Sequence, residues 1–450
     1  MKIDYYDKSM VLDKEDVIKF LSNFQEKRNV SDYIELSIIS IVCEKIGILF
    51  NGAETLNELM DRLPREFIDD VIFDINNMFF ENKQVDYKNK QLSYLIYYLP
   101  ANLFKIWKPL LDLQLKNMLK PNLRVLDIGT GPGSIPIGII EYYSLIARTF
   151  PDQKFKIIFS LVDAQKEFTD IANSIILYVS NYIPDNLTIV VDRIENSFVQ
   201  SENDYSHFGK YDIITFSNFM TFNESTNTDN GYNIIRTFKK FLNDDGSIII
   251  IEPADEINCK NFKKLRNEIV NTGLMNIFSP CIGVWNKKTH YDCNCFNMVR
   301  SFWNTPDIYK LLSQKGLKKG SKNFVPFNYV VFRKDNNKKY AAEKNQKGFT
   351  LLSEIHGKNN EVVNIMALIR TAIYNKSGSL SISLCDGTCD YSDGTSAVWL
   401  NLSSEQLSKQ KIDVKLLTGE RIRINKIKVI QDKQKPNLYL NDDSRIHIDY

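Results

Sequence analysis

The spacing of apolar residues changes along the chain, and this change divides the sequence into parts. Up to about residue 118, apolar residues recur at helical spacing, as in 33–39 and 103–111, which predicts helices. From Leu123 onward, short apolar runs alternate with longer amphipathic stretches, which predicts a parallel sheet covered by helices. The predicted strands are Arg124–Ile128, Lys156–Val162, Leu187–Val191, Asp212–Phe216, Ser247–Ile251 and Tyr329–Phe332.

The last part of the chain is predicted to be rich in strands. Residues 334–347 are polar and rich in Lys and Asn, which indicates a linker. About five short strands follow, with no long helix among them, and they predict a small barrel of the oligonucleotide-binding type or a small sandwich. These strands are Phe349–Ile355, Val362–Ile373, Ser379–Leu384, Ser396–Leu402 and Ile412–Ile430, the last long enough for a hairpin. The predicted domains are therefore a helical domain at 1–118, an α/β domain at 119–335, a linker at 336–347 and a β domain at 348–450.

Composition is typical of a globular protein, with 43% hydrophobic and 25% charged residues. No apolar run approaches the roughly 20 residues that a membrane-spanning helix needs. The first residues, Met1–Asp7, have neither the apolar core of a signal peptide nor the Arg-rich character of a transit peptide. We therefore expect a cytoplasmic protein without a membrane partner.

Charge is unevenly distributed along the chain. The whole sequence is nearly neutral, with 57 Lys and Arg against 55 Asp and Glu, but residues 311–450 hold 23 of the basic residues and 14 of the acidic ones. A basic C-terminal third is consistent with a polyanionic partner such as RNA, and equally with lysine-rich faces that are only solvated.

A glycine-rich loop follows the first predicted strand. The segment 125–134 contains the pattern D-x-G-x-G-x-G, formed by Asp127, Gly129, Gly131 and Gly133. Glycines at these positions let the backbone turn tightly and approach a ligand closely, and the helix that begins near Ser134 would direct its N–H groups at that ligand. Asp127, at the strand end, is placed to hold an ammonium group.

Polar residues also follow the next strands. Asp163 follows the second strand, where a carboxylate can accept hydrogen bonds from both ribose hydroxyls. Asp192 is expected at the end of the third strand, within reach of an adenine amino group, and Ser217 ends the fourth. These residues resemble the S-adenosylmethionine (SAM) motifs of class I methyltransferases in the right order. The alternative is a nucleotide-binding Rossmann fold of another kind.

The acceptor of the methyl group is not evident from the motifs. The segment 217–224 is not the [DN]-P-P-[YF] sequence that presents an exocyclic base amine, and Cys281 lies after the fifth strand, out of register for a nucleophile that attacks a pyrimidine. No general base stands out, so the catalytic residues stay unassigned. Methyl transfer from a sulfonium needs mainly in-line positioning.

Several segments together resemble one family, the methyltransferase-like factors associated with the small ribosomal subunit. The segments lie in one order over about residues 90–335: Leu92–Ala101, Leu126–Ser134, Ser217–Glu224, Ile251–Pro253, Pro280–Cys281 and Phe327–Arg333. The resemblance implies a class I methyltransferase fold and a role in small-subunit assembly, with ribosomal RNA as the partner. It also implies that some members hold a four-iron cluster and that some have lost methyl transfer. DNA is not expected as a partner.

The cysteines indicate a metal site. Seven cysteines, an odd number, argue against a disulfide framework, and Cys281, Cys293 and Cys295 fall in one insertion at about 280–322. In the family the fourth ligand comes from the C-terminal β region, which here offers Cys385, with Cys389 as the alternative. A 4Fe-4S cluster is the first expectation and zinc, with His290 as a further ligand, is the second. Three unligated thiols are the third.

Three features are candidates for contact with RNA. Lys315–Lys322 is a basic loop. Arg421, Arg423, Lys426 and Lys428 alternate along a predicted strand, so we expect them to share one face and contact phosphates. The aromatic residues Trp285, Tyr291 and Trp303 could stack on bases, although core packing is the favoured interpretation.

The sequence thus predicts an α/β protein with a Rossmann-like class I methyltransferase sheet, an N-terminal helical domain and a small C-terminal β-barrel. The first functional hypothesis is a SAM-dependent methyltransferase or assembly factor that acts on small-subunit ribosomal RNA. The second is a non-catalytic assembly protein that binds SAM and metal. The third is a small-molecule methyltransferase.

Overall fold

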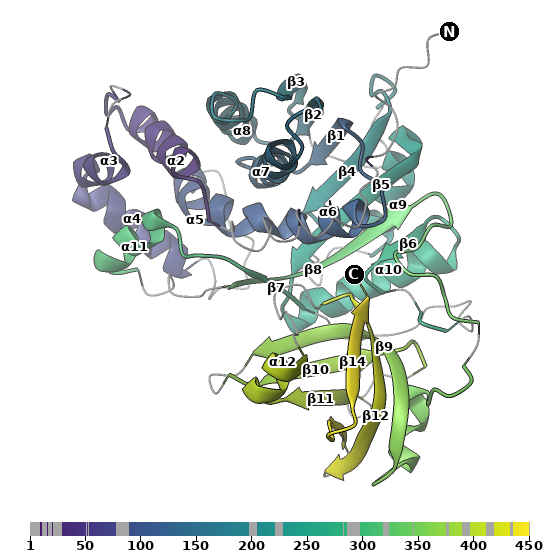
Figure 1. The fold of residues 1–450 in the computed structure, drawn as a ribbon. Helices are drawn as coiled ribbons and strands as arrows, with labels where there is room; N and C mark the ends of the chain where they lie inside the picture. Colours follow the sequence, from purple (N-terminus) through teal and green to yellow (C-terminus); the bar gives the residue numbers. More distant parts are fainter. Residues whose placement is uncertain are drawn as a thin grey trace. The chain divides into compact units, whose positions relative to one another are not determined.

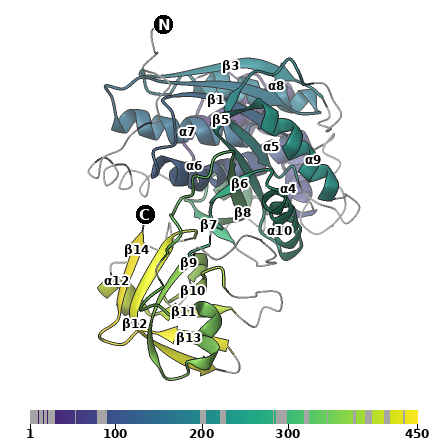
Figure 2. The ribbon, with the colours of Figure 1, turned by 90° about the vertical axis from the view of Figure 1, so that its right-hand side faces the viewer.

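A computed structural model of the chain describes its helices, strands and side chains (Figures 1 and 2). The described residues are 10, 16, 20, 29–50, 52, 54–77, 90–197, 205–220, 228–281, 283–285, 298–317, 324–344, 346–374, 378–388, 397–410, 418–432 and 435–449. The chain divides into two compact units, one of Met1–Ser217 with Ser301–Val325 and the other of Asn218–Arg300 with Pro326–Tyr450.

The first unit contains four parallel strands and the helices that follow them. The strands are β1 (Asn122–Ile128), β2 (Phe155–Val162), β3 (Leu187–Glu195) and β4 (Tyr211–Ser217), and the connecting helices are α7 (Ser134–Thr149) and α8 (Lys166–Val179). Strand β1 pairs in parallel with β2 and with β4, and β2 pairs with β3. The apolar runs of β1 and β2 are buried because both faces of a parallel sheet are covered.

The described helices before β1 are α2 (Asp32–Lys45), α3 (Leu56–Arg62), α4 (Arg65–Asn77), α5 (Gln91–Leu103), η3 (Phe104–Ile106) and α6 (Trp107–Gln114). Helix α2 packs on α8 and helix α5 packs on α7, so these helices belong to the same compact unit as β1–β4. The helical prediction is confirmed for these segments, but a separate helical domain is not. Helix α11 (Asp307–Gln314) also belongs to this unit, and Glu35 of α2 accepts the backbone N–H groups of Asp307 and Ile308.

Gly138 of α7 lies where α7 and the end of α5 cross closely, so there is no room for a side chain at this position. A Cβ atom at this position would lie 2.2 Å from the carbonyl oxygen of Leu103 at the end of α5. We expect Gly138→Ala to lower the free energy of unfolding by about 1–3 kcal/mol, because the two helix backbones must separate. Urea denaturation measures this loss. Gly209→Ala is the control, since a Cβ there meets nothing within 4 Å, and an equal loss in both variants would contradict the prediction.

The second unit holds the remaining part of the α/β sheet. Its elements there are α9 (Thr228–Phe238), η4 (Lys239–Phe241), β5 (Leu242–Pro253), α10 (Glu256–Asn271), β6 (Asn276–Ser279) and β8 (Phe324–Arg333), and β7 (Val299–Phe302) pairs with β8. Strand β8 is antiparallel to both β5 and β6. Within the second unit β8 lies between β5 and β6, and the first unit holds parallel strands in the order β3-β2-β1-β4, as predicted for a Rossmann-like α/β fold.

The C-terminal strands form a closed barrel (Figure 2). The elements are η5 (Leu352–Gly357), β9 (Val362–Tyr374), β10 (Leu380–Cys385), β11 (Val398–Leu402), α12 (Ser404–Gln410), β12 (Arg421–Asp432), β13 (Lys435–Tyr439) and β14 (Arg445–Asp449). The pairing runs β13-β11-β10-β9-β12, and β13 also pairs with β12, which closes five strands into a ring, while β14 adds to β12. Alternate apolar residues such as Ile382, Leu400 and Ile422 fill the interior. The predicted barrel is therefore confirmed, and the sandwich alternative is wrong.

The segment that was predicted as a linker is packed against its neighbours. Lys339 and Tyr340 are buried, and the backbone N–H of Lys339 donates to the carbonyl oxygen of Phe278 in β6. Among the helices that the structure describes, none has the length and apolar character needed to cross a bilayer.

Candidate functional site

The loop between β1 and α7 adopts a backbone that favours glycine. Gly129, Gly131 and Gly133 have φ angles of 69°, 52° and 94°, in the left-handed region. The N–H groups of Gly129 and Thr130 both donate to the carbonyl oxygen of Val162, at 2.8 and 3.0 Å. The loop is thus hydrogen-bonded to the carboxyl end of β2, and it lies between a strand and a helix, as the sequence predicts.

The three glycines differ in what surrounds them. A Cβ atom on Gly133 would lie 3.1 Å from the Cβ of Ala172, so this glycine lets α7 begin directly against α8. A Cβ atom on Gly131 would meet nothing within 4 Å. Gly131 is therefore not required for packing, and its glycine is explained by the positive φ of the loop backbone.

Asp163 lies beside this loop, where it was predicted. One carboxylate oxygen accepts the N–H of Gly131 at 2.9 Å, and the other accepts the N–H of Gln165 at 2.9 Å. Burial raises the pKa of Asp163, while the backbone N–H groups oppose that rise. The structure therefore brings the second-strand carboxylate and the glycine loop together.

Asp127 is the most deeply buried of the predicted cofactor carboxylates. Its side chain is in β1, and its Oδ1 accepts the hydroxyl of Thr215 in β4 at 2.5 Å. Its Oδ2 is buried and has no hydrogen-bond partner among the residues that the structure describes. Burial raises the pKa of Asp127 to about 7. A buried acceptor without a partner is costly unless a ligand satisfies it, and an ammonium group is the partner that best suits a carboxylate.

Asp192 does not lie where the sequence placed it. Strand β3 continues to Glu195, so Asp192 is inside the strand, where it accepts from Arg124 at 2.8 Å and from Ser160 at 2.7 Å. The expectation that it marks the strand end was wrong, because the sequence pattern does not show that β3 continues past a register shift opposite Phe159 and Ser160. The residue that follows β3 is Asn196, which sequence reasoning missed, and its Oδ1 accepts from Thr169 of α8 at 2.6 Å.

Ser217 is the last residue of β4, as predicted. In the second unit, the segment after β4 is fastened by Glu252, whose Oε1 accepts the N–H groups of Phe219 and Met220 at 3.1 and 2.8 Å. Glu252 is 1% exposed. Glu252 belongs to the segment Ile251–Pro253, which carries part of the family resemblance, but its contact partners could not be predicted from the sequence. The rest of the segment 217–224 lies outside the described residues.

Two of the predicted metal ligands are described, and their chain segments meet in the second unit. The N–H of Val284 donates to the carbonyl oxygen of Asp386 at 3.2 Å, and the indole of Trp285 donates to the Asp386 carboxylate at 3.0 Å. Cys281 lies shortly before Val284 in the sequence, and Cys385 is the neighbour of Asp386. Both cysteines are therefore close in sequence to the contact between the two segments. Cys281 also accepts a hydrogen bond from Lys263 at 3.2 Å.

The other predicted metal ligands, Cys293, Cys295, Cys389 and His290, lie outside the described residues. Within the described part of the chain, no three His, Cys, Asp or Glu side chains are grouped so that they could hold a metal ion. The metal prediction therefore stays a prediction.

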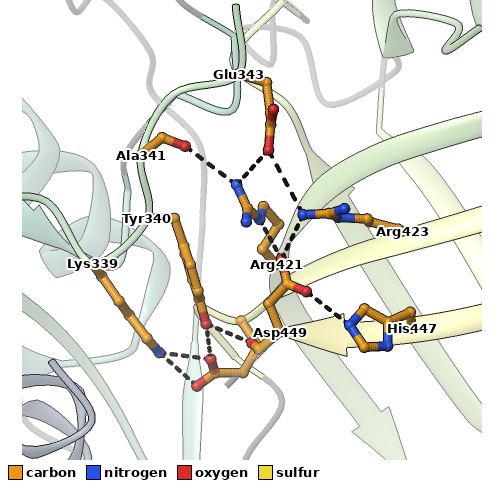
Figure 3. A network of polar contacts seen from close by, with 9 residues as sticks. Lys339, Tyr340, Ala341, Glu343, Arg421, Arg423, His447 and Asp449 are labelled. Atoms are coloured by element: carbon orange, nitrogen blue, oxygen red, sulfur yellow. Dashed lines mark hydrogen bonds and ion pairs between the residues drawn. The ribbon is translucent and has the colours of Figure 1, made fainter. Parts of the chain in front are cut away.

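The predicted row of cations on β12 is only partly available to a polyanion. Figure 3 shows Arg421 and Arg423 directed at two carboxylates, Glu343 and Asp449, and Arg421 lies 3.0 Å from the first and 2.5 Å from the second. A register shift between Ile424 and Ile427 also interrupts the strand's alternation. Lys426 is exposed and Lys428 is half-buried.

The other features proposed for RNA contact have mixed outcomes. Trp285 and Trp303 are 4% and 7% exposed, so the favoured interpretation of core packing is confirmed for both. Tyr291 and the lysines of the basic loop after Lys315 lie outside the described residues, and Lys315 itself lies 3.8 Å from Asp61.

Comparisons with known proteins give weak likenesses. No family model matches the chain, and no curated protein matches it. Among solved structures, a putative class I SAM-dependent methyltransferase from Listeria monocytogenes has a TM-score of 0.33 at 10% identity, over 74% of this chain and 92% of that one. The plantazolicin methyltransferase in complex with S-adenosylhomocysteine (SAH) has a TM-score of 0.28 at 14% identity, over 60% of this chain and 99% of that one. The Ifi202 HINa domain in complex with double-stranded DNA has a TM-score of 0.19 at 13% identity, and this chain spans 59% of its length. Likenesses at this level assign neither a substrate nor an activity to this chain.

Proposed function

We propose that this chain binds SAM at the loop between β1 and α7 and acts as a SAM-dependent methyltransferase. The observation that carries the proposal is the buried Oδ2 of Asp127, which lacks a partner among the described residues. Asp127 directly precedes the glycine loop, and Asp163, which follows β2, accepts a hydrogen bond from that loop. The amino group of SAM would satisfy Asp127, and its ribose hydroxyls would donate to Asp163 in place of the Gly131 N–H. Asn196, rather than Asp192, is the side chain that follows β3.

Bound SAM supplies a methyl group activated on a sulfonium, so the protein's own residues need only bind, orient and exclude water. The loop N–H groups at the start of α7 would orient the ligand's amino-acid end. Glu252 would hold the segment that follows β4 in a fixed conformation.

Calorimetric titration of the full chain with SAM and SAH tests the proposal. Binding of both ligands at micromolar or tighter Kd is expected, and absence of binding of either ligand would reject it. Transfer of a labelled methyl group to immature small ribosomal subunits then separates the catalytic proposal from a non-catalytic SAM-binding role.

We propose further that the acceptor or partner is RNA of the small ribosomal subunit. The supporting features are the basic composition of residues 311–450 and the closed five-stranded barrel, an architecture that includes the oligonucleotide-binding barrels. Filter binding of the full chain to small-subunit RNA should weaken steeply between 50 and 200 mM salt, since cation–phosphate contacts release counterions. RNA binding that does not change with salt, or no RNA binding, would favour the small-molecule methyltransferase.

We propose a metal centre as a structural part of this protein. Its support is the contact between the segments that carry Cys281 and Cys385, together with the hydrogen bond that Lys263 donates to the sulfur of Cys281. A cluster there would join the insertion to the barrel, and its binding would add to the stability of the folded state.

Metal analysis of anaerobically purified protein tests this centre. We expect about four irons with sulfide per chain for a 4Fe-4S cluster, or about one zinc for the alternative. The metal should be lost in Cys281→Ser and kept in Cys43→Ser, because Cys43 is buried in α2 far along the chain from the cysteine insertion. Protein that is fully folded without metal would contradict the proposal.

A further inference from the structure

The outer surface of the barrel carries exposed apolar side chains on neighbouring strands. In β13, Leu438 is buried in the barrel interior, so the next residue, Tyr439, faces outward, and it is 40% exposed. Directly opposite Tyr439 in β12 is Lys428, and Lys428 in turn lies opposite Val362 of β9, which is 55% exposed. These three residues form a row across the outside of the barrel.

A second aromatic residue belongs to the same outer surface. Trp399 of β11 lies opposite Asn437, which is two residues before Tyr439 in β13, and Trp399 is half-buried while its neighbours in β11 are buried. The amide of Asn401 donates to Asn437 Oδ1 at 3.3 Å, and the hydroxyl of Ser381 donates to Asn401 Oδ1 at 2.8 Å. Within the described part of the chain, neither aromatic ring is paired with another ring. The surface thus offers two rings beside an ordered set of polar side chains.

The lysines of β12 differ from its arginines in their ion pairs. Arg421 and Arg423 lie close to the carboxylates of other strands and segments, as described above. Neither Lys426 nor Lys428 forms an ion pair with a residue that the structure describes. The positive charge of this part of β12 is therefore available to an anionic partner.

The position of Lys426 is fixed by its backbone. Lys426 lies at the register shift in β12 and has a φ of 56°, in the left-handed region that a lysine rarely adopts. Three side chains hold it there: Asn364 accepts its N–H at 2.8 Å, and Asn441 and Ser444 donate to its carbonyl oxygen at 2.9 and 2.8 Å. An unfavourable backbone conformation that is held by several contacts is common at binding sites.

We propose that this outer surface of β11, β13 and β12 binds a single-stranded segment of RNA. Tyr439 and Trp399 stack on unpaired bases, and Lys426 and Lys428 contact phosphates. Every base has a face that can stack on a ring, and every nucleotide carries a phosphate, so the surface selects single strands rather than a sequence. The inference rests on the proposed RNA partner and names the part of the barrel that binds it.

Fluorescence anisotropy of the full chain with a labelled single-stranded RNA of about 12 nucleotides tests the rings. In Tyr439→Leu we expect binding to be about 5- to 50-fold weaker, because one base loses its stacking partner. Tyr439→Phe keeps the ring and should bind within about twofold of the wild type. Tyr182→Leu is the matched control and should bind like the wild type, because Tyr182 is 46% exposed but belongs to the first unit.

The salt dependence of the same binding tests the lysines. Lys428→Met should lower the slope of log affinity against log salt concentration by about 1, because one phosphate contact is lost. Lys310→Met is the matched control, since Lys310 is an exposed lysine of the first unit that pairs with Asp307. It should leave the slope unchanged.

The outcomes separate this inference from the proposed function. If the wild type does not bind the RNA, the proposed RNA partner fails and the surface fails with it. If the wild type binds, and both Tyr439→Leu and Lys428→Met bind as it does, the surface is overturned while RNA binding stands. Equal competition by an RNA duplex would also overturn it, because paired bases cannot stack on a tyrosine. If Tyr439→Leu unfolds at the assay temperature, Lys428→Met decides the question alone.

Discussion

Asp127→Asn is expected to weaken SAM binding about 10- to 100-fold, because a charge-assisted hydrogen bond to the ligand's ammonium is replaced by one to a neutral amide. The amide oxygen can still accept from Thr215, so the fold around β1 and β4 is retained. The measurement is calorimetric Kd for SAM. Asp212→Asn is the control, since Asp212 lies at the start of β4 and pairs with Lys120 at 2.9 Å, away from the loop. An unchanged Kd in Asp127→Asn would reject the placement of the ligand's amino group.

The titration of Asp127 gives this prediction a pH dependence. Burial raises the pKa of Asp127 from 3.8 to about 7. Between these two pH values, the Asp127 carboxyl keeps its proton in the folded protein, whereas it has lost the proton in the unfolded chain. The free protein therefore loses stability as pH rises from about 4 to about 7, where the folded group has titrated, and Asp127→Asn should remove that part of the loss.

Pairing with the ligand's ammonium would lower the pKa of Asp127 again. Binding of SAM near pH 7 should thus release a fraction of a proton in the wild type and less in Asp127→Asn. Calorimetry in buffers of different ionisation enthalpy measures the difference, and equal proton release from both proteins would contradict this assignment.

Lys339→Met is expected to lower the free energy of unfolding by about 3–5 kcal/mol, because it leaves a buried carboxylate without its cation. Lys339 Nζ lies 2.7 Å from each carboxylate oxygen of Glu420, and both side chains are 0% exposed. The hydroxyl of Tyr340 donates to the same carboxylate and also to the carbonyl oxygen of Asp449 in β14 (Figure 3). This pair therefore fastens the segment between β8 and the barrel to the barrel itself.

Chemical denaturation checks the prediction, with two further variants. The double variant Lys339→Met with Glu420→Leu should recover most of the loss, since a well-packed apolar pair can replace a buried ion pair at little cost. Arg65→Met, which removes an ion pair that is 94% and 62% exposed, should change stability by less than about 1 kcal/mol. A loss in Lys339→Met no larger than that of Arg65→Met would show that the pair does not stabilise this junction.

The sequence by itself determined the parallel half of the sheet and the centre of the proposed site. Strands β1, β2 and β4 could be predicted from their apolar runs, because strands buried on both faces need nearly continuous hydrophobic residues. The sequence also predicted the glycine loop and the two carboxylates Asp127 and Asp163, because a tight turn and a carboxylate near a strand end are local features of the chain. The basic and cysteine-rich regions were also visible, but their partners were not.

Only the tertiary structure decided the features that depend on pairing between distant segments. The end of β3 depends on a register shift against β2, so Asp192 is inside the strand and Asn196 follows it. The barrel is closed because β13 pairs with both β11 and β12, which no strand pattern reveals. Arg421 forms ion pairs with Glu343 and Asp449, and Lys339 forms one with Glu420. The partners in these pairs are separated by up to about 80 residues along the chain. Charge neutralisation of this kind is set by the approach of side chains in space, which spacing along the sequence does not contain.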